Sequence, residues 1–161
     1  MRRLASLIAA ALLATGISSA AKADLVAATA PIAAPPVEET TPPTIVARID
    51  LSDQTMTVYV AERLAYTFKV STARRGYITP VGRYQALWLS PKHRSRKYDN
   101  APMPWAVFFH GGYAVHGTTE IRRLGKPASH GCVRLHPDNA KTFFSLVKNA
   151  GLEATLITVV N

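Results

Sequence analysis

The strongest constraint on the fold is an alternation of apolar residues, with a period of two, that begins at residue 45. One apolar set comprises Ile45, Ala47, Ile49 and Leu51. After Ser52-Asp53, a second set comprises Met56, Val58 and Val60. Because the side chains of a strand point alternately to the two faces of a sheet, this pattern predicts a β-hairpin with one buried face. We therefore expect a β-rich domain.

The remaining segments support this expectation and add one helix. Further strands are predicted over residues 65–71, 84–89, 105–109, 113–116 and 154–160. Pro137 suits the first position of a helix, and Gly151 suits its C-terminal stop. An apolar helical stripe between them comprises Ala140, Phe143, Phe144 and Val147. The predicted fold is mainly β with one packed α-helix, arranged as a β-sandwich or a partly open barrel.

The N-terminal segment has the composition of a targeting signal. It combines a basic start, an apolar run over residues 4–17 and the cleavage pattern Ala21-Lys22-Ala23. This predicts a secretory signal peptide over residues 1–23. A retained membrane anchor is the alternative, but the 14-residue run is short for a span of about 20 residues. We expect an exported, periplasmic protein of the cell envelope, with no integral membrane segment after signal cleavage.

Residues 24–43 are rich in Ala, Pro, Val and Thr, which predicts an extended linker. The folded domain is then expected over residues 44–161. The stretch 69–97 of this domain contains eight basic residues and no acidic residue. It is either a solvated basic face or a surface that attracts an anionic polymer or a carboxylate-bearing substrate. Export makes nucleic acid an unsuitable partner, and the anions available outside the cytoplasm are cell-wall polymers and anionic lipid surfaces.

Cys132 is the single cysteine of the chain. It excludes an internal disulfide, multi-cysteine zinc sites and iron–sulfur clusters held by several thiolates. A nucleophilic cysteine needs a base or an electropositive setting. His116 ends a predicted strand, a rigid position for such a base, whereas His130 lies two residues before the cysteine. The alternative is a structural thiol in a β core.

The residues around this cysteine suit acyl transfer. An imidazole base needs an acceptor for its second nitrogen, and a backbone carbonyl near Gly117 would serve. Gly131 allows the backbone to approach a substrate closely. The amides of Gly131 and Cys132 could then point at a developing oxyanion.

Two motifs together resemble the signature of the L,D-transpeptidase (YkuD-type) catalytic domain. They are His116-Gly117-Thr118 and Ser129-His130-Gly131-Cys132-Val133-Arg134. The resemblance extends over about residues 44–160. Its further matches are residues 51–58 with Gln54, Thr79-Pro80-Val81-Gly82-Arg83-Tyr84 and Met103-Pro104-Trp105.

The resemblance implies that Cys132 forms a thioester with a peptidoglycan stem peptide and releases D-alanine. His116 would move the proton, the Gly117 carbonyl would hold its ring, and backbone amides of residues 130–132 would bind the oxyanion. The acyl group would pass to an amine, giving a 3-3 crosslink or attachment to an outer-membrane protein or lipoprotein. Transfer to water would make the protein an L,D-carboxypeptidase or amidase instead. Carbapenems are expected to acylate the thiol, and no cofactor or metal is expected.

Four further residues are candidates for substrate binding. Arg134 suits a substrate carboxylate, although a structural ion pair is an equal alternative. Ser129 is a further candidate, and its alternative role is a hydrogen bond to the loop or to His130. Tyr113 and Trp105 could line the cleft, but core packing is favoured for both.

Rival functions fit less well. Penicillin-type enzymes require S-x-x-K, S-D-N and K-T-G motifs, and the chain has no K-T-G. Papain-like peptidases place Cys before His, and caspases separate the two by about 50 residues. A metal site built from His110, His116 and His130 lacks the H-E-x-x-H pattern. A non-catalytic wall-binding domain on the same fold remains the alternative from a different class.

Overall fold

A five-stranded sheet forms around the predicted N-terminal hairpin in the computed structural model, which describes residues 43–161. The hairpin is confirmed as β1 (Ile45–Asp50) paired antiparallel with β2 (Thr55–Val60). The strand order is β3-β2-β1-β9-β4, and β1 runs parallel to β9. The other strands of this sheet are β3 (Arg63–Lys69), β4 (Gly82–Gln85) and β9 (Thr155–Val160). The predicted signal peptide (1–23) and linker (24–43) lie outside the described residues, apart from Pro43.

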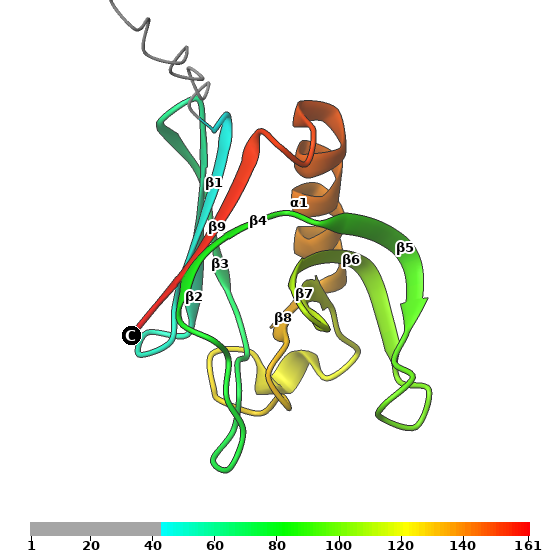
Figure 1. Cartoon of the computed structure of the whole chain (residues 1–161). Helices are drawn as coiled ribbons and strands as arrows, with labels where there is room; N and C mark the ends of the chain where they lie inside the picture. Colours follow the sequence, from blue (N-terminus) through cyan, green and yellow to red (C-terminus); the bar gives the residue numbers. More distant parts are fainter. Residues whose placement is uncertain (1–42) are drawn as a thin grey trace, which may run out of the picture. The chain divides into compact units, whose positions relative to one another are not determined.

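A second sheet carries the motif residues. Its order is β5-β6-β7-β8, and β7 runs parallel to β8 while the other pairs are antiparallel. Figure 1 shows this sheet opposite the first, with the orange β8 beside β7. A short 3-10 helix, η1 (Ile121–Arg123), lies in the connection between β7 and β8. The strands are β5 (Trp88–Arg94), β6 (Pro102–His110), β7 (Tyr113–Gly117) and β8 (Val133–Leu135).

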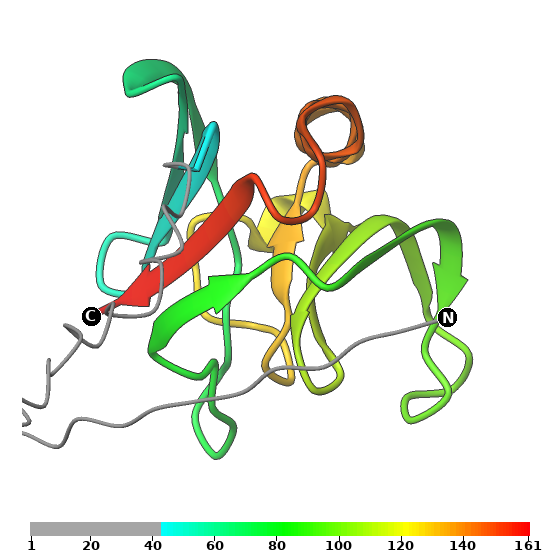
Figure 2. The ribbon, with the colours of Figure 1, turned by 45° about the horizontal axis from the view of Figure 1, so that its top comes forward.

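The predicted helix is confirmed as α1 (Pro137–Ala150). His136 caps its N-terminus by accepting the Asp138 amide, and Gly151 follows its last residue with φ 100°. Its apolar stripe is buried, and the helix packs mainly on β6 and β7. Figure 2 looks nearly along its axis and shows it beside both sheets.

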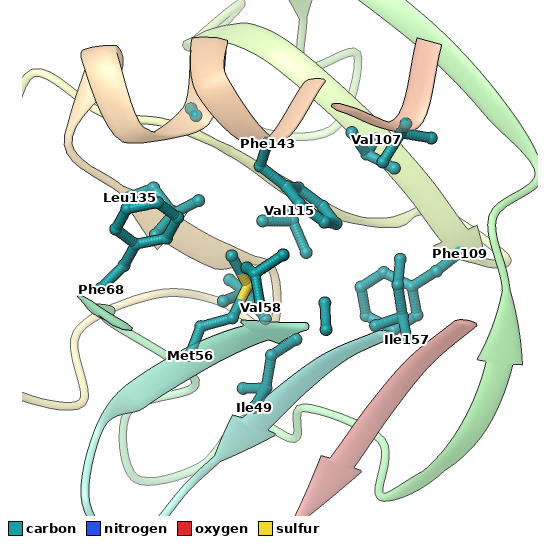
Figure 3. Packing of buried hydrophobic residues seen from close by; sticks show 14 of the residues in the cluster. Ile49, Met56, Val58, Phe68, Val107, Phe109, Val115, Leu135, Phe143 and Ile157 are labelled. Carbon is teal, nitrogen blue, oxygen red and sulfur yellow. The ribbon is translucent and has the colours of Figure 1, made fainter. Parts of the chain in front are cut away.

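One hydrophobic core joins the two sheets and the helix. Figure 3 shows Phe143 pointing from α1 among side chains of both sheets, including Val58 and Val115. Because two mixed sheets share this core and the strand orders do not close on themselves, the expected mainly β sandwich with one packed helix is confirmed for residues 43–161.

The prediction of one strand over residues 84–89 is wrong, because the chain changes sheets there. The Ala86 amide donates to Thr155 of the first sheet, whereas the next amide, Leu87, donates to Phe108 of the second. The rest of β5 gave no apolar alternation because it is an edge strand with exposed residues, and it contains Pro91, which edge strands tolerate. β8 was missed because three residues are too few to establish a period.

Truncation of Phe143 tests the shared core. Its side chain is fully buried, so Phe143→Ala is expected to lower the free energy of unfolding by about 3 to 5 kcal/mol. Urea unfolding followed by circular dichroism measures the change. Ser145→Ala on the exposed face of the same helix is the control, with an expected change within about 0.5 kcal/mol. Equal effects of the two substitutions would contradict the packing described here.

Candidate active site

A cavity of about 550 Å³ opens beside β7 and β8 and contains both motifs. Its polar wall includes Ser129, His130, Arg134 and Glu120 as well as His116 and Cys132. Its apolar and aromatic wall includes Trp88, His93, Tyr98, Met103 and Phe108. The cavity is therefore polar where the motif residues meet and apolar on the side of β5 and β6.

The parallel pairing of β7 with β8 brings the histidine and the cysteine together. Val115 pairs with Val133, and His116 pairs with Arg134. Cys132 immediately precedes β8, so in the same register it lies level with Ala114, near the start of β7. Two residues that are 16 positions apart in the chain thus line one cavity from neighbouring strands.

Cys132 is half-buried against a small apolar cluster of Met103, Ala106, Phe108 and Ala114. Its Sγ lies 3.8 Å from the Gly112 carbonyl oxygen. Burial raises the pKa of this thiol, while a backbone hydrogen bond from Ala114 and the charge of Arg134 act in the opposite direction. The resting group is therefore a thiol at neutral pH.

His116 is buried in β7, and its Nδ1 lies 2.7 Å from the Gly117 carbonyl oxygen. Because a carbonyl can only accept, Nδ1 must carry hydrogen, which leaves the lone pair of the neutral ring on Nε2. Burial lowers the pKa of His116 to about 4; the Gly117 hydrogen bond opposes this, and the charges of Arg134 and His93 add to it. The ring is therefore neutral at pH 7 and is able to accept a proton.

The loop before the cysteine requires glycine at position 131. Gly131 has φ +128°, and a Cβ there would lie 2.5 Å from Tyr113 Cε1 and 2.7 Å from the Ile78 carbonyl oxygen. Its amide donates to Ser129 Oγ at 3.0 Å, and its carbonyl accepts from Thr79 Oγ1 at 2.8 Å. The Gly131 amide is thus already engaged within the loop.

The segment 71–79 forms a frame behind this loop. The Thr72 carbonyl accepts the amides of Ala128 and Ser129, each at 2.9 Å, and the Arg74 amide donates to the Ser129 carbonyl at 3.0 Å. The Thr72 amide donates in turn to Gln54 Oε1 at 2.9 Å. A chain of hydrogen bonds therefore connects the turn between β1 and β2 with the cysteine loop.

The roles of Thr72 and Thr79 were not predicted from the sequence. Gln54 and Thr79 lie within segments that match the family, but their hydrogen-bond partners are far away in the chain. Gln54 reaches Thr72 across 18 positions, and Thr79 reaches Gly131 across 52. The sequence shows only that Gln54 lies beside a turn and Thr79 beside a proline. Such a position does not identify the residue to which the side chain hydrogen-bonds.

His130 lies between two aromatic rings. It stacks on Tyr98 with a centroid distance of 4.4 Å and meets the edge of Tyr77 at 4.6 Å. Burial lowers its pKa, and the neighbouring charges of Arg74, Arg134 and Lys97 contribute to the shift. The His130 ring is thus packed between aromatic rings, whereas the His116 ring is fixed by a hydrogen bond to a backbone carbonyl.

The other predicted binding residues divide between the cavity and the core. Arg134 Nη1 lies 2.7 Å from Glu120 Oε2, and both residues line the cavity. Ser129 is buried and accepts the Gly131 amide. Trp105 and Tyr113 pack against the main core instead, with the Trp105 ring 5.5 Å from that of Phe144.

Among residues 43–161, no three His, Cys, Asp or Glu side chains are grouped as metal ligands. None of the helices in this part of the chain is long and apolar enough to cross a membrane.

A model of the YkuD family, described as the L,D-transpeptidase catalytic domain, matches residues 44–159. The chain belongs to this family. The YkuD protein of Bacillus licheniformis, a candidate L,D-transpeptidase by its name, is 27% identical over 103 residues, which are 63% of this chain and 59% of that protein. This chain thus spans about three-fifths of the length of the curated relative.

Solved structures of L,D-transpeptidases share the fold. The Mycobacterium smegmatis protein has a TM-score of 0.66 at 24% identity and covers 74% of this chain and 59% of its own. The Stackebrandtia nassauensis protein has a TM-score of 0.65 at 24% identity, with coverages of 78% and 60%. An L,D-transpeptidase solved in complex with imipenem has a TM-score of 0.64 at 23% identity, with coverages of 73% and 59%.

Substitution of Gly131 tests whether the loop before Cys132 requires glycine. Gly131→Ala places a Cβ against Tyr113 and the Ile78 carbonyl. The backbone conformation alone is expected to cost about 1 to 3 kcal/mol of unfolding free energy. Gly112→Ala is the control, because its Cβ would meet no atom within 4 Å. A Gly131→Ala protein as stable as the control in urea would contradict the described loop.

The pH dependence of thiol alkylation tests the neutral state of the pair. Because burial raises the pKa of Cys132 above the ordinary value of a thiol, the rate of alkylation by iodoacetamide should rise with pH through the neutral range and beyond it, following the thiolate fraction. Intact-mass spectrometry at timed intervals measures the rate. A plateau across the neutral range would instead indicate a preformed thiolate–imidazolium pair.

Proposed function

We propose that this member of the L,D-transpeptidase family is an exported peptidoglycan L,D-transpeptidase with Cys132 as nucleophile and His116 as general base. The observation that carries the proposal is the neutral, oriented imidazole of His116 in the same cavity as the thiol. A merely structural thiol would not need a buried base of this kind.

In the first half-reaction, His116 Nε2 accepts the Cys132 proton as Sγ attacks a peptide carbonyl of a stem peptide. A carbon–sulfur bond forms, and the carbonyl oxygen becomes an oxyanion. When this oxyanion collapses, the carbon–nitrogen bond to D-alanine breaks, and the imidazolium returns its proton to the departing amine. The product on the protein is a thioester.

The oxyanion requires donors, and the amides of residues 130–132 were predicted to supply them. Because the Gly131 amide donates to Ser129 Oγ, we assign the oxyanion to the amides of His130 and Cys132. Gly131 then contributes its positive φ and its lack of a side chain, which bring these amides close to the substrate.

In the second half-reaction, an acceptor amine attacks the thioester and His116 accepts its proton. A new carbon–nitrogen bond forms, the carbon–sulfur bond breaks, and the imidazolium returns the proton to the departing Cys132 thiolate. The amine of a second stem would give a 3-3 crosslink, and an amine of an outer-membrane protein or lipoprotein would give protein attachment. Attack by water would give hydrolysis. The chemistry of the site is the same for all three acceptors, so the acceptor is decided by access to the thioester.

Charge at the cavity suits a peptide that carries carboxylates. Arg96, Lys97 and Arg134 line it, and Glu120 is the acidic partner of Arg134. A substrate carboxylate is able to replace Glu120 as the partner of the Arg134 guanidinium.

We propose that residues 1–23 direct export and that residues 24–43 link the domain to its position in the envelope, where such peptides are found.

Acylation by a carbapenem tests the nucleophile and the base. Incubation of the mature protein with imipenem should give one covalent adduct by intact-mass spectrometry, and Cys132→Ala should give none. His116→Ala should be acylated about 10²- to 10⁴-fold more slowly, the range that general-base catalysis supplies. His110→Ala, an exposed histidine in β6, should match the wild type.

A stem-peptide assay then separates the classes of function. With a stem peptide and an acceptor amine, the wild type should release D-alanine and give the transfer product, and Cys132→Ala should do neither. Release of D-alanine without transfer would identify a hydrolase. A folded wild type that binds peptidoglycan but is neither acylated nor active would identify a non-catalytic wall-binding domain and overturn the proposal.

A further inference from the structure

Thr79 is a buried residue of the frame segment 71–79 whose hydroxyl has two backbone partners. Its side chain is 3% exposed. Oγ1 accepts the Ala73 amide at 3.0 Å and lies 2.8 Å from the Gly131 carbonyl oxygen. Since a hydroxyl has one hydrogen and a carbonyl can only accept, that hydrogen must be donated to Gly131. The direction of the contact is therefore fixed.

This hydrogen bond also determines the direction of the Cys132 amide. The Gly131 carbonyl and the Cys132 N–H belong to one peptide unit, which is planar, and in the trans form the two groups point in opposite directions. Thr79 fixes the direction in which this oxygen points. The Cys132 N–H is therefore held pointing in the opposite direction, within the same plane.

Glycine makes such an external restraint necessary. Gly131 has φ +128°, and a residue without Cβ loses little when its neighbouring peptide planes rotate. Both planes that flank it are held by hydroxyl groups. Ser129 Oγ accepts the Gly131 amide in the preceding plane, and Thr79 donates to the carbonyl of the following plane.

We propose that Thr79 is a positioning residue for acyl transfer, which acts by aiming the Cys132 amide at the oxyanion. This inference rests on the proposed function, because it assumes that the Cys132 amide binds an oxyanion. Thr79 itself does not line the cavity. Its hydrogen bond also polarises the shared peptide unit, which strengthens the Cys132 N–H as a donor.

Two reactions of the same thiol isolate this role. Acylation by imipenem passes through a tetrahedral oxyanion, whereas alkylation by iodoacetamide is a displacement at a saturated carbon and forms none. A residue that aims an oxyanion donor should affect the first reaction and spare the second. A residue that only keeps the loop folded should affect both.

The test compares Thr79→Val, which keeps the shape and removes the hydroxyl, with Thr79→Ser, which keeps the hydroxyl. Thr79→Val is expected to slow acylation about 10- to 100-fold, less than the roughly 10²- to 10³-fold lost when an oxyanion donor is removed outright. Its alkylation rate should stay within about twofold of the wild type. Thr79→Ser should restore most of the acylation rate.

Thr155→Val is the matched control. Thr155 is equally buried, and its hydroxyl donates to the Gly151 carbonyl at 2.9 Å, between α1 and β9. Thr155→Val removes the same kind of hydrogen bond outside the cavity. Its rates of acylation and alkylation should therefore equal those of the wild type. Thr79→Ala repeats the deletion with a smaller side chain if Thr79→Val does not fold.

Three results would overturn the inference. Unchanged acylation of Thr79→Val would remove the positioning role, and an equal loss of acylation and alkylation would reduce Thr79 to a structural residue. A wild-type protein that is alkylated but not acylated would overturn the proposed function, and with it the role of Thr79. Selective loss of acylation, with rescue by Thr79→Ser, would establish the role.

Discussion

The parallel pairing of β7 with β8 is the constraint on which the candidate site depends. Its register sets His116 beside Arg134, with Cys132 directly before the paired segment. A shift of this register by one residue would turn the side chains of β8 to the opposite face of the sheet. The core holds the register, because Val115, Val133 and Leu135 of these two strands are fully buried.

Burial determines the charge state of the site as well as its geometry. It disfavours the charged form of both groups, so the pKa of His116 falls to about 4 and that of Cys132 rises. The pair is therefore a thiol and a neutral imidazole at neutral pH. In the proposed reaction, proton transfer must then accompany the attack on the substrate. The Gly117 carbonyl would support this step, because its contact with Nδ1 leaves the lone pair on Nε2.

A shell of polar side chains supports the reactive loop from behind. Gln54 accepts a hydrogen bond from the Thr72 amide, and the Thr72 carbonyl accepts one from the Ser129 amide. The hydroxyl of Ser129 accepts the Gly131 amide, and the hydroxyl of Thr79 donates to the Gly131 carbonyl. Among residues 43–161, no buried side-chain nitrogen or oxygen lacks a partner. A fully satisfied network of this kind fixes a backbone conformation that glycine alone would leave free.

The sequence by itself determined the family, the opening hairpin, the helix from Pro137 and the two motifs that meet at the cavity. These features are local: a strand or helix period repeats over six or more residues, and a motif is contiguous. Only the tertiary structure decided that the chain changes sheets at Ala86 and that Thr79 reaches Gly131. Each of these depends on a contact between residues far apart in the chain, and a residue's own type carries little information about such a partner.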